Sequence, residues 1–267
     1  MEAQKTCYLF FDFDGTVTAD IRTTLPDGSE KMCRILPECH LNSLKSVHDA
    51  GHKIFICTGR SRGSMLGINK DWLPALDLPW DGMLFGASDM WYNGKRISIK
   101  YIPREEIYFW LDYCKNTGRV FCYNGTETPI RYDFSMEPSP DRVAEIYKDV
   151  ERQIIENPLT NMSVIPSALD IDSKKTSLSV VNLKRYSDIF PPGANKGQAI
   201  KHFCKLINAP MEQTICFGDS ENDIDMFKVC NSSVAMKNSP DSLKKLATYS
   251  AKSDFGVSEA IKLFFGI

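Results

Sequence analysis

The stretch that decides the fold is Cys7-Tyr8-Leu9-Phe10-Phe11-Asp12-Phe13-Asp14-Gly15-Thr16, an almost wholly apolar run that ends in two carboxylates, a glycine and a threonine. A short apolar run followed by glycine is typical of a central strand in a parallel sheet. In such sheets ligand chemistry lies just beyond the carboxyl ends of the strands. One aspartate could attack a substrate while the other moves protons or helps to hold a metal. The stretch therefore predicts a buried strand that leads into a charged site.

Two simpler interpretations of Asp-x-Asp-Gly are a surface turn and a calcium-binding loop. A calcium loop of the EF-hand type needs Gly at its sixth position and Glu at its twelfth. Counted from Asp12, those positions hold Val17 and Thr23. A surface turn does not account for two similar strand ends farther along the chain.

The second strand end follows the apolar run 53–57, which leads into Thr58-Gly59-Arg60. The third follows the run 214–217 and carries the densest acidic cluster of the chain, Gly218-Asp219-Ser220-Glu221-Asn222-Asp223. Ser220 and Asp223 have the spacing of a box that begins a helix, with apolar residues after it. Helix capping does not account for Asp219 or Asn222.

Lys196 lies in the first turn of an amphipathic helix expected over 196–207. The helix dipole disfavours a cation there, so an ordinary surface lysine is slightly less expected at this position than elsewhere. By itself this signal is weak, because a lysine near a helix start is usually solvated. Lys196 becomes a candidate phosphate ligand only when it is considered together with the other three segments.

Taken in order, Asp12-Phe13-Asp14-Gly15-Thr16, Thr58, Lys196 and Gly218 to Asp223 resemble the four motifs of the haloacid dehalogenase (HAD) superfamily of phosphohydrolases. Val234-Ala235-Met236-Lys237-Asn238 and Asp254-Phe255-Gly256-Val257 resemble its Cof-type subfamily. The resemblance implies an α/β fold, in which a Rossmann-like parallel sheet forms the core domain and an α+β cap of type II is inserted into it. The order and placement of all four motifs make the match specific.

We expect the core domain to comprise residues 1–84 and 188–267, and the cap residues 85–187. The core should hold helices near 37–50, 196–207, 220–230 and 240–247. The inserted segment has a different pattern of expected helices and strands. It should hold a hairpin at 90–99 around Asn93-Gly94, helices near 103–117 and 140–156, and strands at 119–123, 162–165 and 176–183.

The resemblance also implies a role for each motif residue. The expected catalytic residues are Asp12 as nucleophile, Asp14 as acid and base, Thr58 and Lys196. The expected phosphate ligands are Gly15, Thr16, Thr58, Gly59, Lys196 and Asn222. The expected ligands of an essential Mg2+ ion are Asp12, Asp14, Asp219, Asn222 and Asp223, the last two placed to orient the other ligands, water molecules or Lys196.

Composition restricts the possible partners. The 267 residues are 43% apolar and 25% charged, with a net charge of -2 and no basic block, so nucleic acid is not an expected partner. No apolar span reaches membrane length and no signal peptide precedes Asp12, so we expect no membrane association. Nine cysteines without a Cys-x-x-Cys spacing indicate reduced thiols and a cytoplasmic protein. His40 and His48 match no common zinc spacing and are expected on the exposed face of a helix. The oligomeric state stays open.

The sequence thus predicts a Mg2+-dependent phosphatase that hydrolyses small phosphorylated metabolites, with sugar phosphates favoured by family analogy. A phosphomutase of hexose phosphates is the alternative, because nothing near the motifs decides whether water reaches the aspartyl-phosphate. A catalytically silent phosphate-binding protein is disfavoured, because all the acids are present. Polar candidates near the cap interface are Arg60, Ser88, Asp89, Tyr92, Lys174 and Lys175.

Overall fold

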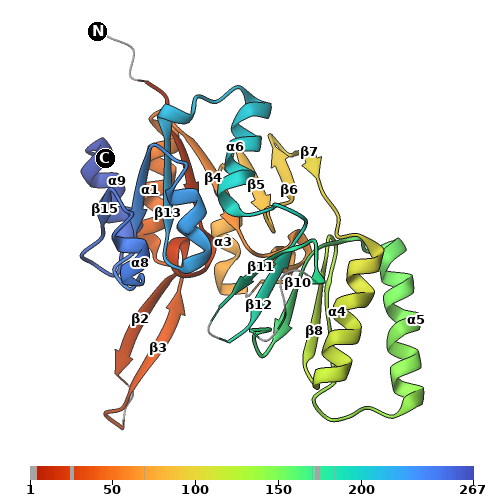
Figure 1. Cartoon of the computed structure of the whole chain (residues 1–267). Helices are drawn as coiled ribbons and strands as arrows, with labels where there is room; N and C mark the ends of the chain where they lie inside the picture. Colours follow the sequence, from red (N-terminus) through yellow and green to blue (C-terminus); the bar gives the residue numbers. More distant parts are fainter. Residues whose placement is uncertain (1–4, 25–26, 69, 170, 172–174, 184) are drawn as a thin grey trace.

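The computed structural model describes residues 5–24, 27–68, 70–169, 171, 175–183 and 185–267, which form a large and a small lobe (Figure 1). The helices are α1 Glu38–Asp49, α2 Arg62–Leu66, α3 Leu73–Leu76, α4 Arg104–Thr117, α5 Pro140–Glu156, α6 Lys196–Ile207, α7 Ile224–Phe227, α8 Asp241–Lys244 and α9 Gly256–Phe265. The strands from β1 to β8 are Tyr8–Phe11, Ala19–Thr24, Glu30–Ile35, Lys53–Thr58, Gly82–Phe85, Asp89–Tyr92, Lys95–Ile99 and Val120–Gly125. Those from β9 to β15 are Pro129–Asp133, Leu159–Ile165, Ser179–Asn182, Ser187–Phe190, Thr214–Gly218, Ser232–Ala235 and Tyr249–Ser250.

The large lobe is built on one sheet with the strand order β15-β14-β13-β1-β4-β5-β6-β7. Its strands are parallel from β15 to β5. Strand β1 lies between β13 and β4, so the carboxyl ends of the three motif-bearing strands are neighbours. This arrangement confirms the predicted α/β fold and brings the first, second and fourth motifs to one edge of the sheet.

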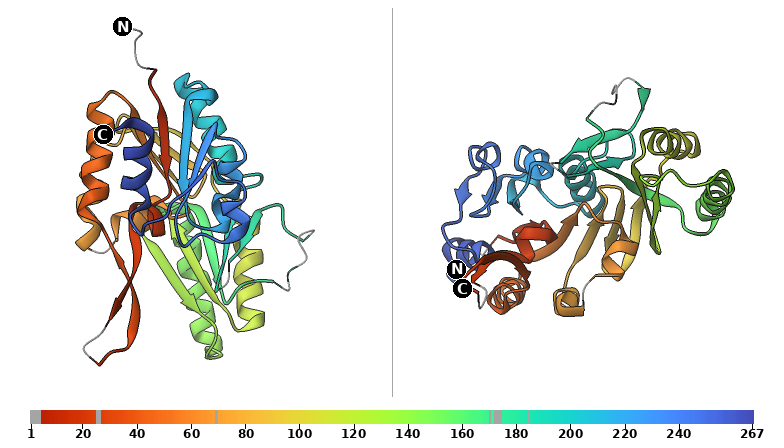
Figure 2. Two further views of the ribbon diagram at one scale, coloured as in Figure 1. Left: turned by 90° about the vertical axis from the view of Figure 1, so that its left-hand side faces the viewer. Right: turned by 90° about the horizontal axis from the view of Figure 1, so that it is seen from below.

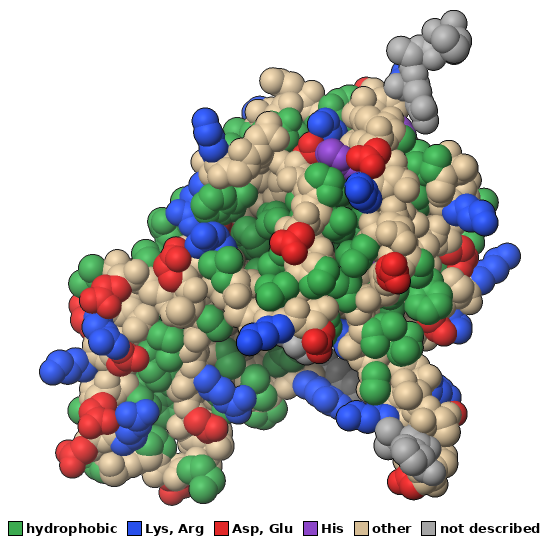
Figure 3. Space-filling model, turned by 180° about the vertical axis from the view of Figure 1, so that it is seen from behind, with side chains coloured by type: hydrophobic (Ala, Val, Ile, Leu, Met, Phe, Trp, Pro, Cys, Tyr) green, Lys and Arg blue, Asp and Glu red, His purple; other side chains and the backbone are tan. Residues whose placement is uncertain are grey.

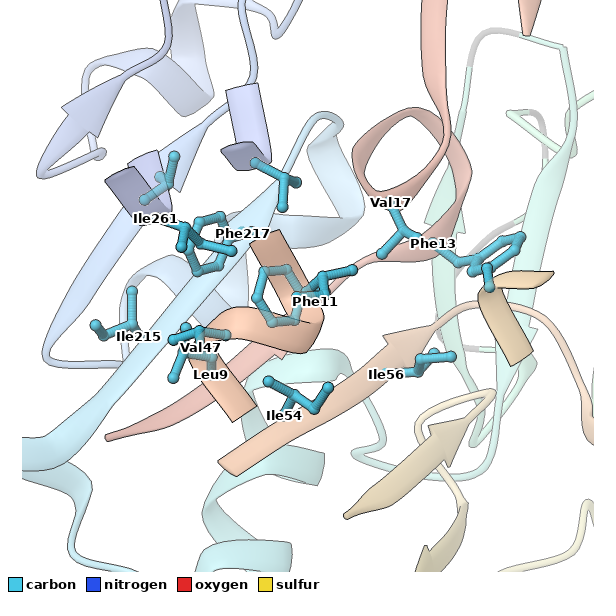
Figure 4. Packing of buried hydrophobic residues seen from close by; sticks show 14 of the residues in the cluster. Leu9, Phe11, Phe13, Val17, Val47, Ile54, Ile56, Ile215, Phe217 and Ile261 are labelled. Carbon is cyan, nitrogen blue, oxygen red and sulfur yellow. The ribbon is translucent and has the colours of Figure 1, made fainter. Parts of the chain in front are cut away.

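Alternate residues of the central strands pack on opposite faces of the large sheet. Leu9, Phe11 and Phe217 point to the face that α1 and α9 cover, where Val47 and Ile261 meet them (Figure 4). Phe10, Phe55 and Cys216 point to the other face, against α6 and α7. The two layers of helices are visible in the side and bottom views (Figure 2). Burial on both faces explains why these strands are apolar throughout.

The small lobe, residues 104–190, is an antiparallel sheet with the strand order β11-β12-β10-β8-β9. One face packs on α4 and α5 through Trp110, Val150, Phe121 and Met162. The strands alternate, so the polar residues between these apolar ones face the other way, toward the large lobe. The helices that were predicted near 103–117 and 140–156 are confirmed as α4 and α5.

The hairpin predicted at 90–99 exists as β6 and β7, but its placement in the inserted segment was wrong. Strand β6 pairs antiparallel with β5, so the hairpin extends the edge of the large sheet. Gly86 and Ala87 both have positive φ, 53° and 54°, which is typical of tight turns that join antiparallel strands. Strand β12 lies in the small sheet. By sheet membership the inserted lobe therefore begins and ends later than residues 85–187.

Two further features differ from the sequence analysis. The strands β2 and β3 form a separate hairpin that projects from the large lobe, and no pattern predicted it (Figure 1). His40 is fully buried rather than exposed, with its Nδ1 atom 2.8 Å from the carbonyl oxygen of Val17. Burial lowers the pKa of His40, so the neutral ring is favoured.

Candidate active site

The first motif turns sharply at the end of β1. The backbone N–H of Asp12 donates to the carbonyl of Phe217 at 2.9 Å, which holds the end of β1 against β13. Gly15 has a φ of +85°, and a Cβ atom there would lie 2.5 Å from the carboxylate of Asp219. Glycine is therefore required at this position both by backbone conformation and by the close approach of the fourth motif.

Lys196 joins the third motif to the first and the fourth. Its Nζ atom donates to Asp12 at 2.7 Å and to Asp223 at 2.6 Å, and the lysine is only 4% exposed. The side chain of Asn195 begins α6 by accepting from the N–H of Gln198, and so fixes where Lys196 starts. Burial disfavours the charge of Lys196, but Asp12 and Asp223 outweigh it and raise the pKa of the ammonium group. Lys196 is therefore a permanent cation at the centre of the site.

Asp12, Asp219 and Asp223 form an acidic triad, in which one carboxylate oxygen of each lies within 4.8 Å of the others. Asp223 is held by the backbone N–H groups of Asp219 and Ser220 at 2.9 and 3.0 Å. Burial raises the pKa of Asp12 to about 6, although Lys196 opposes the rise. Burial and the charges of Asp12 and Asp223 raise the pKa of Asp219 as well. Three close carboxylates share one lysine, so the triad has excess negative charge, and its hard oxygen donors fit a divalent cation such as Mg2+.

Asp14 lies outside the triad and is paired with two arginines. Arg60 donates to its two oxygens at 2.6 and 2.8 Å, and Arg34, from β3, donates at 3.0 Å. Arg34 also makes a two-point ion pair with Asp20 at 2.7 Å. Burial opposes ionisation of Asp14, but the arginines outweigh it and hold the pKa of Asp14 below its usual value. Asp14 is thus a carboxylate here.

A cavity of about 530 Å³ opens over these residues between the two lobes, and basic side chains gather along the hollow (Figure 3). Thr58, Gly59 and Asn222 line it beside Asp12, Asp14 and Asp219. Thr58 is 1% exposed, and its hydroxyl accepts from the N–H of Arg60 at 3.1 Å. The first, second and fourth of the segments that were singled out in the sequence thus line one cavity, and Lys196 of the third is joined to them through its bond to Asp12.

Several predicted residues lie elsewhere. Gly15 and Thr16 do not line the cavity, and the N–H of Gly15 donates to the hydroxyl of Thr18 at 3.0 Å. Asp89, a candidate for the cap interface, is fully buried and paired with Arg96 at 2.9 Å. The remaining candidates are Ser88, which is buried and does not line the cavity; Tyr92, which packs on Phe203; Lys175, which does not line the cavity; and Lys174, which lies outside the described residues.

The small lobe contributes residues that the sequence analysis did not identify. Asn124, Asn161, Ser163 and Asp188 all line the cavity from β8, β10 and β12. Asn124 donates to Ser163 at 3.2 Å, and Ser163 donates to one oxygen of Asp188 at 2.7 Å. Burial raises the pKa of Asp188 to about 6. The available signal was weak: polar residues at alternate strand positions, which are also typical of a solvated face.

Over residues 9–261 the chain matches the family of haloacid dehalogenase-like hydrolases. It belongs to this family. The phosphoglycolate phosphatase of Nitrosopumilus maritimus is 31% identical over 268 residues, covering 94% of this chain and 92% of its own. A putative phosphatase of Streptococcus pyogenes serotype M6 is 43% identical over only 79 residues, so this chain spans 29% of that relative's length. The structure of a sugar phosphatase of HAD subclass IIB superposes with a TM-score of 0.76 over 98% of this chain and 100% of that one, at 22% identity.

Family membership confirms the predicted resemblance, including its Cof-type branch, and the small lobe corresponds to the predicted cap. The protein is therefore a hydrolase of the phosphatase type. No helix in the described ranges has the length and apolar character that a membrane span needs.

Proposed function

We propose that the protein is a Mg2+-dependent phosphatase of small phosphorylated metabolites, with sugar phosphates foremost, and that it acts through an aspartyl-phosphate at Asp12. The bridge that Lys196 makes between Asp12 and Asp223 carries this proposal. This bridge holds one oxygen of Asp12 against the ammonium group of Lys196. Asp12 itself lines the cavity, together with Thr58 and Asn222. All nine cysteines are unpaired, which supports a cytoplasmic location as part of the proposal.

In the first half-reaction a carboxylate oxygen of Asp12 attacks phosphorus, and the bond between phosphorus and the ester oxygen breaks. Protonated Asp14 gives its proton to the departing oxygen, and an alcohol leaves. In the second half-reaction Asp14 takes a proton from water, whose oxygen attacks phosphorus. The bond to Asp12 then breaks, inorganic phosphate leaves, and Asp14 is protonated again.

Neutralisation of the phosphoryl charge is the main demand of this chemistry. Lys196 and the hydroxyl of Thr58 would hold phosphoryl oxygens, and Asn222, which lines the same cavity as Thr58, would support them. A Mg2+ ion held by Asp12, Asp219, the Asp14 carbonyl and Asp223 through water would supply the charge that allows an anionic carboxylate to approach an anionic phosphate. Without substrate, Arg60 and Arg34 favour the ionised form of Asp14, which suits its role as a base. To act as the acid, Asp14 must first take up a proton, and the approach of a negatively charged phosphate favours this because a like charge raises a carboxyl pKa.

Magnesium should stabilise the protein as well as activate it. Because the triad binds a cation only when folded, saturating Mg2+ should raise the midpoint of thermal unfolding, by the equivalent of about 2.7 kcal/mol at one hundred times the dissociation constant. Asp219→Asn should lose most of this rise, since it removes one ligand and leaves Lys196 paired. Calorimetry with and without Mg2+ measures the effect. Turnover that persists undiminished after exhaustive chelation would contradict the metal assignment.

Asp188 should help to select the leaving group. It is buried, lines the cavity and has no cation within ion-pair distance in the described ranges, so its free oxygen favours a substrate hydroxyl. A hydrogen bond to a charged group contributes about 1.5–3 kcal/mol. We therefore expect Asp188→Ala to lower kcat/KM for a hexose phosphate roughly 10- to 100-fold and to change that for p-nitrophenyl phosphate far less. Equal losses on both substrates would contradict a role in selection.

The direct test of hydrolysis follows a labelled hexose phosphate by NMR in the presence of Mg2+. We expect inorganic phosphate and free sugar in equal amounts. Accumulation of a positional isomer without inorganic phosphate would favour the phosphomutase alternative and contradict the hydrolase.

A further inference from the structure

A bulge in β10 fits into the junction between the two lobes. Leu159 pairs with Gly125 and Asn161 pairs with Asn124, so Thr160 is an extra residue in the strand. The carbonyl of Thr160 accepts from the hydroxyl of Ser88 at 3.1 Å. Bulges bend a strand and redirect its side chains, and they occur often beside functional sites. This one turns Asn161 toward the large lobe.

Asn161 makes a direct hydrogen bond to the second motif. Its Nδ2 atom donates to the carbonyl oxygen of Gly59 at 3.1 Å, and the residue is only 1% exposed. Gly59 follows Thr58 and lines the cavity with it. The point where a Cβ of residue 59 would stand is 3.6 Å from Asp188 and 3.7 Å from Asn222. The backbone held by Asn161 therefore lies between the leaving-group side of the cavity and the fourth motif.

The surroundings of Asn161 are adapted to this one contact. Its Oδ1 atom is buried and has no hydrogen-bond partner among the described residues. A Cβ on Gly86 would lie 2.9 Å from that oxygen, so the absence of a side chain at residue 86 makes room for the amide. An unpaired buried acceptor is destabilising, and a side chain kept solely for stability would not be expected to carry one. Of the two polar atoms of the Asn161 amide, the one with a hydrogen-bond partner among the described residues is Nδ2, which donates to Gly59.

We propose that Asn161 is a positioning residue for phosphoryl transfer, which fixes Gly59 and hence Thr58 when the small lobe is seated on the large lobe. The inference rests on the proposed function, because Thr58 is the group through which Asn161 acts. It gives the small lobe a part in holding the phosphoryl group, in addition to the selection of the leaving group that is proposed for Asp188. Loss of Asn161 should impair every substrate alike, because the phosphoryl group is common to all of them.

The test compares Asn161→Ala with Ser88→Ala, which removes another buried hydrogen bond at the same bulge without touching Gly59. We expect Asn161→Ala to lower kcat for p-nitrophenyl phosphate and for a hexose phosphate by the same factor, at least tenfold, since small misplacements of reacting groups can cost about 100-fold. Inhibition by vanadate, which mimics the phosphoryl group, should weaken in parallel. The rise in unfolding midpoint with Mg2+ should be unchanged. Ser88→Ala should keep kcat within about twofold of the unaltered protein.

Asn161→Asp provides a second variant that keeps the shape of the side chain and replaces the amide donor by an oxygen. It should be as impaired as Asn161→Ala. The inference is overturned if either Asn161 variant keeps full kcat and vanadate affinity, or if Ser88→Ala loses as much activity as they do. An unaltered protein that hydrolyses no phosphate ester in Mg2+ would overturn the proposed function and this inference with it, whereas the variant results affect the inference alone.

Discussion

Replacing Asp12 by Asn should abolish phosphate release and leave the protein folded. Asn keeps the shape of the side chain but removes the charged oxygen that attacks phosphorus. Lys196 retains Asp223 as a partner at 2.6 Å, so no buried charge becomes unpaired. Loss of a group that works as part of a catalytic unit lowers kcat by roughly 10,000-fold or more.

Release of p-nitrophenolate measures the Asp12→Asn effect, and circular dichroism checks the fold. Asp225→Asn is a matched control, because Asp225 lies on the neighbouring α7 and, among the residues that the structure describes, its side chain makes a single 3.7 Å ion pair with exposed Lys228. The control should behave like the unaltered protein. Activity near that of the unaltered protein in folded Asp12→Asn would contradict covalent catalysis at this residue.

Lys196→Met should damage both activity and stability. Removing one partner of a buried ion pair costs about 3–5 kcal/mol of unfolding free energy, because the remaining charges lose their compensation. Asp12 and Asp223 would face each other and Asp219 without a cation. Activity should fall with stability, because Lys196 is also a phosphoryl ligand in the proposed mechanism.

The pH and metal dependence of Lys196→Met distinguish this cause from lost packing. The pKa of Asp12 is raised to about 6 even beside Lys196, so without the lysine its protonated form is favoured further. A raised carboxyl pKa contributes stability at low pH that is lost as pH rises through the folded pKa. The variant should therefore be less destabilised at pH 5 than at pH 8, and Mg2+ should restore part of the loss at pH 8. A loss that is equal at both pH values and insensitive to Mg2+ would contradict the electrostatic account.

The sequence predicted the core of the site because chemistry and local structure coincide there. Asp12, Thr58 and Asp219 each follow an apolar strand directly, and parallel strands bring their carboxyl ends to one edge. Lys196 was identifiable only together with the other three segments, because a lysine at the start of an amphipathic helix is usually solvated. In these cases the residues that define the element are neighbours of the residues that are proposed to carry the chemistry.

The rest depends on contacts between segments that are distant in sequence. Arg34 reaches Asp14 because β2 and β3 fold back as a hairpin, which no local pattern indicated. Asn161 and Ser163 alternate with apolar residues, a pattern that is the same whether the polar face meets water or another lobe. His40 has the spacing of an exposed helical face, but its bond to Val17 allows burial. Residues 89–99 likewise join the large sheet because β6 pairs with β5, and the local sequence pattern does not specify this pairing.

The stereochemical course at phosphorus tests the central claim most directly. An aryl phosphorothioate labelled with 18O at one position would be hydrolysed in 17O water with Mg2+, and the chirality of the released thiophosphate determined. Each in-line displacement at phosphorus inverts its configuration. Attack by Asp12 followed by attack of water predicts net retention. Net inversion would show a single displacement by water and would contradict the aspartyl-phosphate intermediate.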